Sequence, residues 1–481
     1  MQRPFAYSKW FQPTSIGLGL LSVVGYAATA SFLYFAIPFA FLYLVLMGIN
    51  WKAAWMVILF TIPFSIQIWF LGETLSTSVP DEPLMWLFLL LFAVLFFKNP
   101  KLLPEWWWRH PLVLLITLQY LWTIVAVVFS EEQFVSIKFL LAKSWFLIGF
   151  FILPVLIFKE KKDFKNAFFL FMIPLLITVL IIFYRHKQMG FNFRKIEKAI
   201  GDLYYNHVDY STIISMYFPV LVIAYSLSKG QKWWIRLTLL LIALFFLPAI
   251  YLTYARAAMI AVIFSGVIYI AIKLRLVNWV VPSLYALLIL LIVFLANHNK
   301  YLEYRPNYER TFMHGNFASH MAATLKGQDM SSMERLYRWI AAVRMSKARP
   351  ITGVGPNAFY DFYKPYAVSS FRTYVSRNDE HSTTHNYFLY MLVEQGWPAL
   401  ILYSLLIFFF FYYAQKIYWR LRDPFYKKTV LAIAMMFAAG FINNFFSELI
   451  ETHKVGALFY LCIALLIVID RKSNMQETSI V

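Results

Sequence analysis

Long apolar stretches separated by short polar loops recur along almost the whole chain. A bilayer core of about 30 Å needs roughly 20 apolar residues in a helix. Only 14% of the residues are charged, against about a quarter in soluble domains. The sequence therefore predicts an all-α, polytopic transmembrane helical bundle with 12–14 spans. The expected spans lie near residues 15–30, 32–48, 52–71, 82–97, 111–129, 138–158, 166–184, 209–228, 234–253, 255–273, 279–297, 397–415, 428–446 and 455–470.

One long polar stretch interrupts this pattern and divides the chain into four parts. Residues 1–297 are expected to form a transmembrane bundle of about 11 spans. Residues 298–386 form a large loop with an amphipathic helix, residues 387–470 form the last three spans, and residues 471–481 form a tail. The single cysteine, Cys462, lies in the last span, which excludes intrachain disulfides and multi-cysteine metal sites.

Positive charge on short loops indicates which side faces the cytoplasm. Loops such as KEKKDFK and SKGQKWWIR alternate with acidic or nearly neutral ones such as SEEQ. This alternation predicts that both termini are cytoplasmic and that the 298–386 loop is extracytoplasmic. That loop and the 185–207 loop are nevertheless basic. Either they are solvated faces attracted to anionic headgroups, or they guide an anionic substrate to its site.

Arg256 lies in the apolar context YLTYARAAMIAV, at a turn between two expected spans. Ionisable groups at membrane depth are costly and tend to be functional. The guanidinium fork suits phosphate oxygens, and the alanines around Arg256 would admit a bulky headgroup. The alternative is an arginine that extends to the membrane surface without a functional role.

The large loop contains a helix signal in SSMERLYRWIAAVRMSKARP. Ser331 and Glu334 match a capping box, and Pro350 marks the far end. The expected apolar face consists of Met333, Leu336, Ile340 and Val343, with Trp339 beside it and Arg335, Arg338 and Arg349 on another face. Such a helix is expected to lie along the membrane surface with its apolar face toward lipid. The arginines are either solvated there or bind a substrate.

His385 and Asn386 end the polar loop, just before an apolar stretch that Gly396 interrupts. A histidine at a helix N-terminus tends toward its neutral form, which a general base requires. The alternative is an ordinary capping residue. A metal site that pairs His381 with His385 has little support, because no second ligand motif accompanies them. No metal and no cofactor are therefore expected.

Taken together, these segments resemble the O-antigen ligase and O-antigen polymerase superfamily of bacterial membrane glycosyltransferases. TYARAAM is similar to the family's Ser-Arg-Gly motif, with Ala255 and Ala257 replacing serine and glycine. ERLYRW and PITGVGPNAF resemble its Arg-x-x-x-Trp and Gly-x-Gly-x-x-x-Phe signature, and His385 to Gly396 resembles its His-x10-Gly pattern. YYNHVDYS, with His207, resembles the start of an earlier span.

The resemblance implies a metal-independent, inverting transfer of a glycan from undecaprenyl pyrophosphate to an acceptor sugar hydroxyl, on lipid A–core in a ligase. It implies the periplasmic face of the bacterial inner membrane, with membrane lipids as surroundings and no nucleic acid as partner. By the same resemblance, Arg256, Arg335 and Arg338 would bind the pyrophosphate and His385 would activate the acceptor. Supporting positions would be Asn386, Trp339, His207 and Gly396.

Two other functions stay open. A polymerase of the same superfamily would use a growing glycan as acceptor. A lipid-linked glycan transporter would instead show inverted repeats and broken helices near the bilayer midplane.

Overall fold

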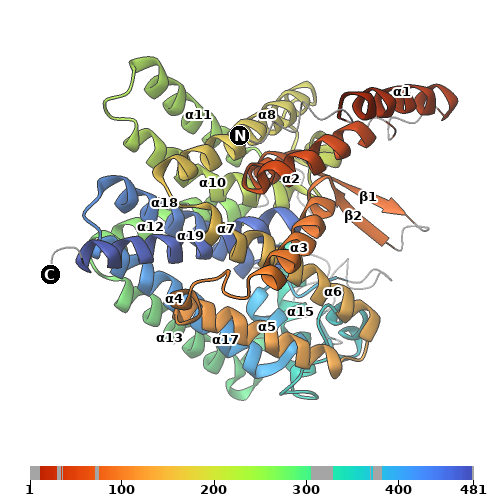
Figure 1. The fold of residues 1–481 in the computed structure, drawn as a ribbon. Coiled ribbons are helices and arrows are strands. Elements are labelled where there is room, and N and C mark those ends of the chain that lie inside the picture. Colours follow the sequence, from red (N-terminus) through yellow and green to blue (C-terminus); the bar gives the residue numbers. More distant parts are fainter. Residues whose placement is uncertain are drawn as a thin grey trace.

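The computed structural model describes residues 11–29, 34, 36–70, 75–304, 329–368, 370–371 and 382–478. In these residues the chain is a bundle of long helices with one small β-hairpin at its edge (Figure 1). The all-α, polytopic fold class is thereby confirmed. The longer described helices are α1 (Phe11–Thr29), α2 (Ala36–Thr61), α3 (Asp81–Lys98), α5 (Pro111–Val128), α6 (Gln133–Phe146), α8 (Lys161–Gln188), α10 (His207–Leu227), α11 (Trp233–Tyr251), α12 (Arg256–Lys273), α13 (Val277–Ala296), α15 (Met330–Ser346), α17 (Tyr387–Arg420), α18 (Pro424–Phe445) and α19 (His453–Thr478).

Among the described residues, 11 helices are long and apolar enough to cross a membrane. They are α2, α6 continued through a π-helical turn into α7 (Leu153–Ile157), and α5, α8, α10, α11, α12, α13, α17, α18 and α19. Two further apolar helices, α1 and α3, occupy the positions expected near 15–30 and 82–97. The short helical elements are η3 (Ile62–Phe64), α4 (Glu105–Trp108), η5 (Phe193–Lys195), α9 (Ile196–Ile200), η6 (Gly201–Leu203), η7 (Asn297–Tyr304), α16 (Phe359–Phe362), η8 (Lys364–Tyr366) and η9 (Leu449–Glu451).

The region between residues 32 and 79 departs from the expected pattern. The spans expected at 32–48 and 52–71 are one helix, α2, which is kinked at Asn50 (φ −150°). The Asn50 side chain accepts a hydrogen bond from the backbone N–H of Ala53 at 3.2 Å and so caps the second half. After η3, strands β1 (Ile66–Phe70) and β2 (Leu75–Val79) pair antiparallel, with Ile66 opposite Val79. The expectation of helix up to residue 71 was wrong because periodicity does not separate short apolar strands from helices.

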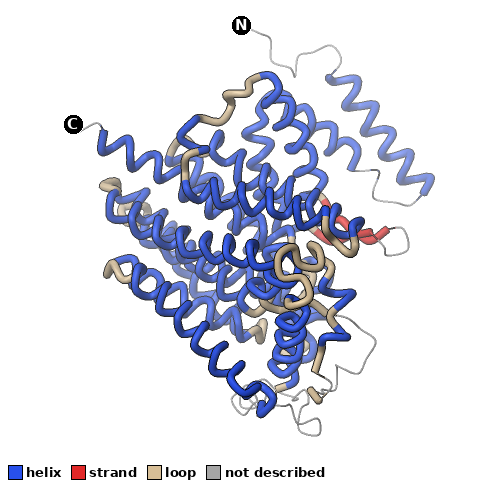
Figure 2. The backbone as a smooth tube through the Cα atoms, turned by 90° about the horizontal axis from the view of Figure 1, so that it is seen from below, coloured by secondary structure: helices blue, strands red, loops and turns tan. Residues whose placement is uncertain are grey.

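Helix α18 lies at the centre of the bundle and packs most extensively against α10 and α12. Small residues permit this close approach, and a Cβ on Gly440 would lie 3.0 Å from the Met216 side chain. Helix α19 is almost wholly buried, whereas α13 exposes most of its apolar side chains. Figure 2 shows the long helices running in similar directions, so that their ends gather at two opposite ends of the bundle.

One of these ends collects the polar segments, and we call it the loop end. Here α15 packs against α17. The side chain of Asn386, just before α17, donates to the carbonyl oxygen of Phe445 at the end of α18 at 3.0 Å. Thr452, just before α19, donates to Asp209 in the first turn of α10 at 3.3 Å. The starts of three spanning helices and the end of a fourth therefore meet beside α15.

Candidate active site

Helix α15 begins with a different cap from the one expected. The N-cap is Asp329, whose Oδ2 accepts from the backbone N–H of Ser332 at 2.9 Å and from its hydroxyl at 2.7 Å. The Ser331–Glu334 capping box is therefore wrong. A carboxylate at this position also interacts favourably with the positive end of the helix dipole. The helix ends at Ser346, before Pro350.

The two faces of α15 differ in burial. The buried face carries Glu334 and Arg338 together with Ala341, Ala342 and Met345. On the expected apolar face, the Val343 side chain remains exposed. Met333, Leu336 and Ile340 of that face are half-buried. The helix therefore buries Glu334 and Arg338 among small and apolar side chains, and the structure brings Arg338 into the protein interior.

Arg256 joins this helix to the spanning bundle. It is the first residue of α12, and its Nη2 lies 2.9 Å from Oδ2 of Asp329, whose side chain is fully buried. Two residues earlier, Tyr254 has φ +58° and donates from its hydroxyl to the Phe191 carbonyl at 2.6 Å, which fixes the turn. A cation at a helix N-terminus is opposed by the helix dipole. Its placement there is consistent with a site that receives an anion.

Of the three arginines at this site, Arg335 has no carboxylate partner among the described residues. Its Nη1 donates to the Ser331 hydroxyl at 3.1 Å, and its Nε is buried without a hydrogen-bond partner in that part of the chain. By contrast, Arg338 pairs with Glu334 at 3.3 Å. Burial, followed by the nearby charge of Arg256, lowers the pKa of Arg335 to about 10. Arg335 therefore stays positively charged at neutral pH.

His385 lies two residues before the start of α17 and has a left-handed backbone conformation, with φ +49°. Asn386 follows as the N-cap, and its side chain accepts from the N–H groups of Phe388 and Leu389 at 3.0 Å. The His385 Nε2 lies 3.3 Å from the Ser382 hydroxyl. Burial, then the charges of Arg338 and Arg335, lower the pKa of His385 to about 3. The imidazole is consequently neutral at physiological pH.

Glu448, between α18 and α19, was missed by the sequence analysis. Its carboxylate accepts a hydrogen bond from the Thr383 hydroxyl and one from the backbone N–H of His385. Burial is the largest effect on Glu448 and raises its pKa to about 7. The hydrogen bond from Thr383 and the charges of Arg338 and Arg335 act in the opposite direction and limit this rise. Glu448 lies in the short polar connection SELIETHK, and nothing in this local pattern indicates that its carboxylate bonds to the His385 backbone.

We call Arg256, Arg335, Arg338, His385 and Glu448 the arginine cluster. The other positions expected from the sequence lie around it or apart from it. The Trp339 ring packs edge-on against Phe445 with centroids 6.3 Å apart. His207, the first residue of α10, contacts Glu197 through its Nδ1. In the described residues we find no contact from His207 to Arg256, Arg335 or His385. His381 lies outside the described residues.

Gly396 has a structural role in this arrangement. It adopts φ +77° and ψ −176° within α17, a conformation that is essentially restricted to glycine. The turn at residues 350–355 docks on this kink: Trp397 N–H donates to Pro350 O at 2.9 Å and Gly355 N–H to Glu394 O at 2.9 Å. A Cβ on Gly396 would lie 1.9 Å from the Ile351 carbonyl oxygen. Gly396 therefore anchors the segment that follows α15.

We expect Gly396→Ala to destabilise the protein by at least about 1–3 kcal/mol, the usual cost of such a backbone conformation. Thermal unfolding of the detergent-purified protein measures this as a lowered transition temperature. Gly266→Ala in α12 is the matched control, because its Cβ would meet nothing within 4 Å. Equal unfolding temperatures for the two variants would contradict the anchoring role of Gly396.

The cluster spans Arg256 to Glu448 along the chain, and a family comparison covers most of it. Residues 238–404 match the model of the family described as O-antigen ligase. The match supports the O-antigen ligase superfamily for this part of the chain. The matched O-antigen ligase region contains Arg256, Arg335, Arg338 and His385, and Glu448 lies beyond it. A comparison with curated proteins gave no match.

Members of this family are glycosyltransferase-like enzymes, and the 11 long apolar helices of the described residues indicate a multi-pass membrane protein. Lipid-linked glycans and glycan acceptors are the partners of such enzymes in general. No group of three or more His, Cys, Asp or Glu side chains that could hold a metal ion occurs within the described ranges.

Proposed function

We propose that the chain transfers a glycan from undecaprenyl pyrophosphate to a sugar hydroxyl of an acceptor such as lipid A–core. The supporting observation is that Arg256, Arg335 and a neutral His385 gather at the loop end. Of the three arginines, Arg256 and Arg338 already contact carboxylates. Arg335 therefore supplies the guanidinium that is most available to an incoming phosphate.

The chemistry needs little beyond these groups. The bond from the anomeric carbon to the pyrophosphate oxygen breaks, and pyrophosphate leaves with the electron pair. Arg335 and Arg256 stabilise its growing charge, which is the largest contribution that such a site can make. The acceptor oxygen bonds to the anomeric carbon and gives its proton to the imidazole of His385. A single displacement inverts the anomeric centre.

The proposed setting is the bacterial inner membrane, with cytoplasmic termini and the loop end facing the periplasm. Short basic segments lie at the opposite end of the bundle, as in KEKKDFK at the start of α8, and this agrees with the positive-inside rule. The donor headgroup would then meet Arg256 and Arg335 at the periplasmic membrane surface.

Purified protein incubated with lipid-linked glycan, with and without lipid A–core, separates the candidate functions. A ligase yields glycan on lipid A–core only when this acceptor is present. Longer lipid-linked glycan in the absence of lipid A–core would identify a polymerase and would overturn the ligase assignment. If glycan remains on its original lipid under both conditions, the protein is not a transferase.

The pH dependence of kcat/KM for the donor distinguishes the ionisation of Glu448 from that of His385. A negatively charged donor binds better when Glu448 is neutral, so ionisation of Glu448 near pH 7 should weaken donor binding. We expect kcat/KM for the donor to fall about fivefold between pH 7 and pH 8, as the neutral fraction of Glu448 falls. Glu448→Gln stays neutral and can still accept the His385 N–H, so its profile should be flat in that range. A fall near pH 7 that persists in Glu448→Gln would contradict the assignment to Glu448.

A further inference from the structure

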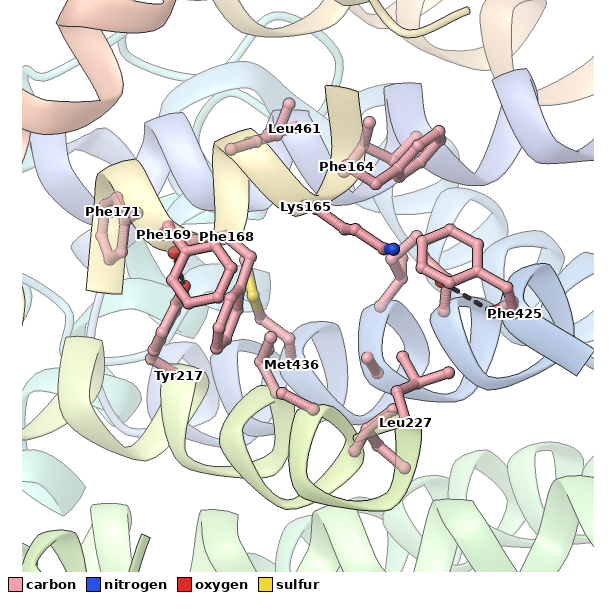
Figure 3. Close-up of a pocket in the computed structure, with 18 of the residues that line it drawn as sticks. Phe164, Lys165, Phe168, Phe169, Phe171, Tyr217, Leu227, Phe425, Met436 and Leu461 are labelled. Atoms are coloured by element: carbon pink, nitrogen blue, oxygen red, sulfur yellow. Dashed lines mark hydrogen bonds between the residues drawn. The ribbon is translucent and has the colours of Figure 1, made fainter. Parts of the chain in front are cut away.

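An apolar cavity lies among α8, α10, α11, α18 and α19, far from the arginine cluster. Its volume is about 580 Å³, and it is lined mainly by apolar side chains such as Phe168, Tyr217, Met436 and Leu461 (Figure 3). The α18 residues that line it run from Phe425 to Met436, in the first part of that helix. Asn386, next to His385 of the cluster, contacts the other end of α18 at Phe445. The cavity therefore belongs to the half of the bundle opposite the loop end.

The mouth of the cavity lies where helices begin. Lys165 is in the second turn of α8, Gln231 precedes α11, and Phe425 is in the first turn of α18. Beside the mouth, Trp233 and Trp234 are 74% and 53% exposed at the start of α11. Exposed tryptophans at the end of a spanning helix mark the membrane–water interface. The mouth is therefore at headgroup depth, and the cavity extends from there toward the bilayer interior.

Among the described residues that line the cavity, one is a cation, Lys165. Figure 3 shows the Lys165 side chain extending into the cavity toward Phe425, whose ring centroid lies 5.8 Å from Nζ. Neighbouring Lys161 pairs with Asp423 at 2.6 Å. In the described part of the chain, no carboxylate lies within ion-pair distance of Lys165. An ammonium group above an apolar cleft is complementary to an anionic headgroup with a hydrocarbon chain.

We propose that this cavity binds one anionic phospholipid of the surrounding bilayer, with its phosphate at Lys165 and one acyl chain between Phe168 and Met436. An apolar cavity of this kind does not hold water, whereas hydrocarbon is at hand on the lipid-facing side, where Phe169 is 45% exposed. The distance from the loop end argues against the glycan donor as occupant, because its pyrophosphate would bind at Arg335. The bound lipid would fill the gap between α8 and α10 and hold the two helices in register with α18.

Native mass spectrometry of protein from nanodiscs of phosphatidylcholine and phosphatidylglycerol tests this site. We expect wild type to retain one phosphatidylglycerol in preference to phosphatidylcholine. Lys165→Glu should reduce that preference about fivefold or more. Lys162→Glu is the matched control, since Lys162 is on the same helix but does not line the cavity. Ala224→Phe, which places a ring inside the cavity, should lose the retained lipid.

Three results would overturn the proposal. The first is equal retention of both lipids by wild type. The second is an unchanged preference in Lys165→Glu. The third is displacement of phosphatidylglycerol by an equal amount of undecaprenyl phosphate, which would assign the cavity to the polyprenyl lipid instead.

Discussion

Replacing His385 with alanine should lower kcat for glycan transfer by about 10²–10⁴-fold, the usual contribution of a general base. The imidazole is neutral because it is buried beside Arg338 and Arg335, which hold the pKa of His385 near 3. A neutral imidazole is the form that a general base needs, and we propose that His385 takes the proton of the acceptor hydroxyl. Donor binding should change little, since pyrophosphate is held by the guanidinium groups. Single-turnover transfer from lipid-linked glycan measures the loss.

The backbone of His385 requires a second variant. Because φ is +49°, alanine could disturb the loop, whereas asparagine tolerates the left-handed region. His385→Asn should therefore fold normally and be equally inactive. His298→Ala is the matched control, because His298 is an exposed histidine with φ +52° outside the cluster. Full activity in both His385 variants would remove its role as base.

Replacing Arg335 with alanine should lower kcat/KM for the donor by about 10²–10³-fold, as expected for loss of one group that stabilises the leaving charge. Arg335 is the guanidinium that lacks a carboxylate partner in the described residues, so its loss removes the charge most available to pyrophosphate. Arg335→Lys should recover only part of the activity, because lysine keeps the charge but not the fork. Steady-state kinetics with varied donor measures both effects.

Arg344 provides the control on the same helix. Its Nη2 contacts the Tyr301 hydroxyl at 3.4 Å, away from the cluster, so Arg344→Ala should keep wild-type kcat/KM. If Arg335→Ala and Arg344→Ala behave alike, pyrophosphate binds elsewhere or the loss reflects only general surface charge.

The spanning helices could be predicted because each needs a long apolar run, and most of the expected spans coincide with helices. The exceptions share a cause. The kink at Asn50 and strand β1 lie in or beside apolar sequence, where hydrophobicity alone does not report backbone breaks. Hydrogen bonds that hydrophobicity does not report decide the structure there, namely the one that Asn50 accepts from the Ala53 N–H and those that pair β1 with β2.

The candidate site was predictable only where a residue is unusual for its surroundings. Arg256 between two apolar runs and His385 before α17 stood out, and the structure brings both beside α15. Asp329 and Glu448 did not stand out, because an acid in a polar loop is ordinary until folding buries it. Their partners, Arg256 for one and the His385 N–H for the other, are distant in sequence. Gly396 was noted as a break, but its contact with Ile351 depends on the turn that docks there.

The most direct test is an experimental structure of the protein bound to undecaprenyl pyrophosphate in a lipid nanodisc. The two phosphates should lie within hydrogen-bond distance of Arg335 and Arg256, with His385 facing the position of the anomeric carbon. Pyrophosphate bound at another place, with Arg335 still in contact only with Ser331, would contradict the proposed site.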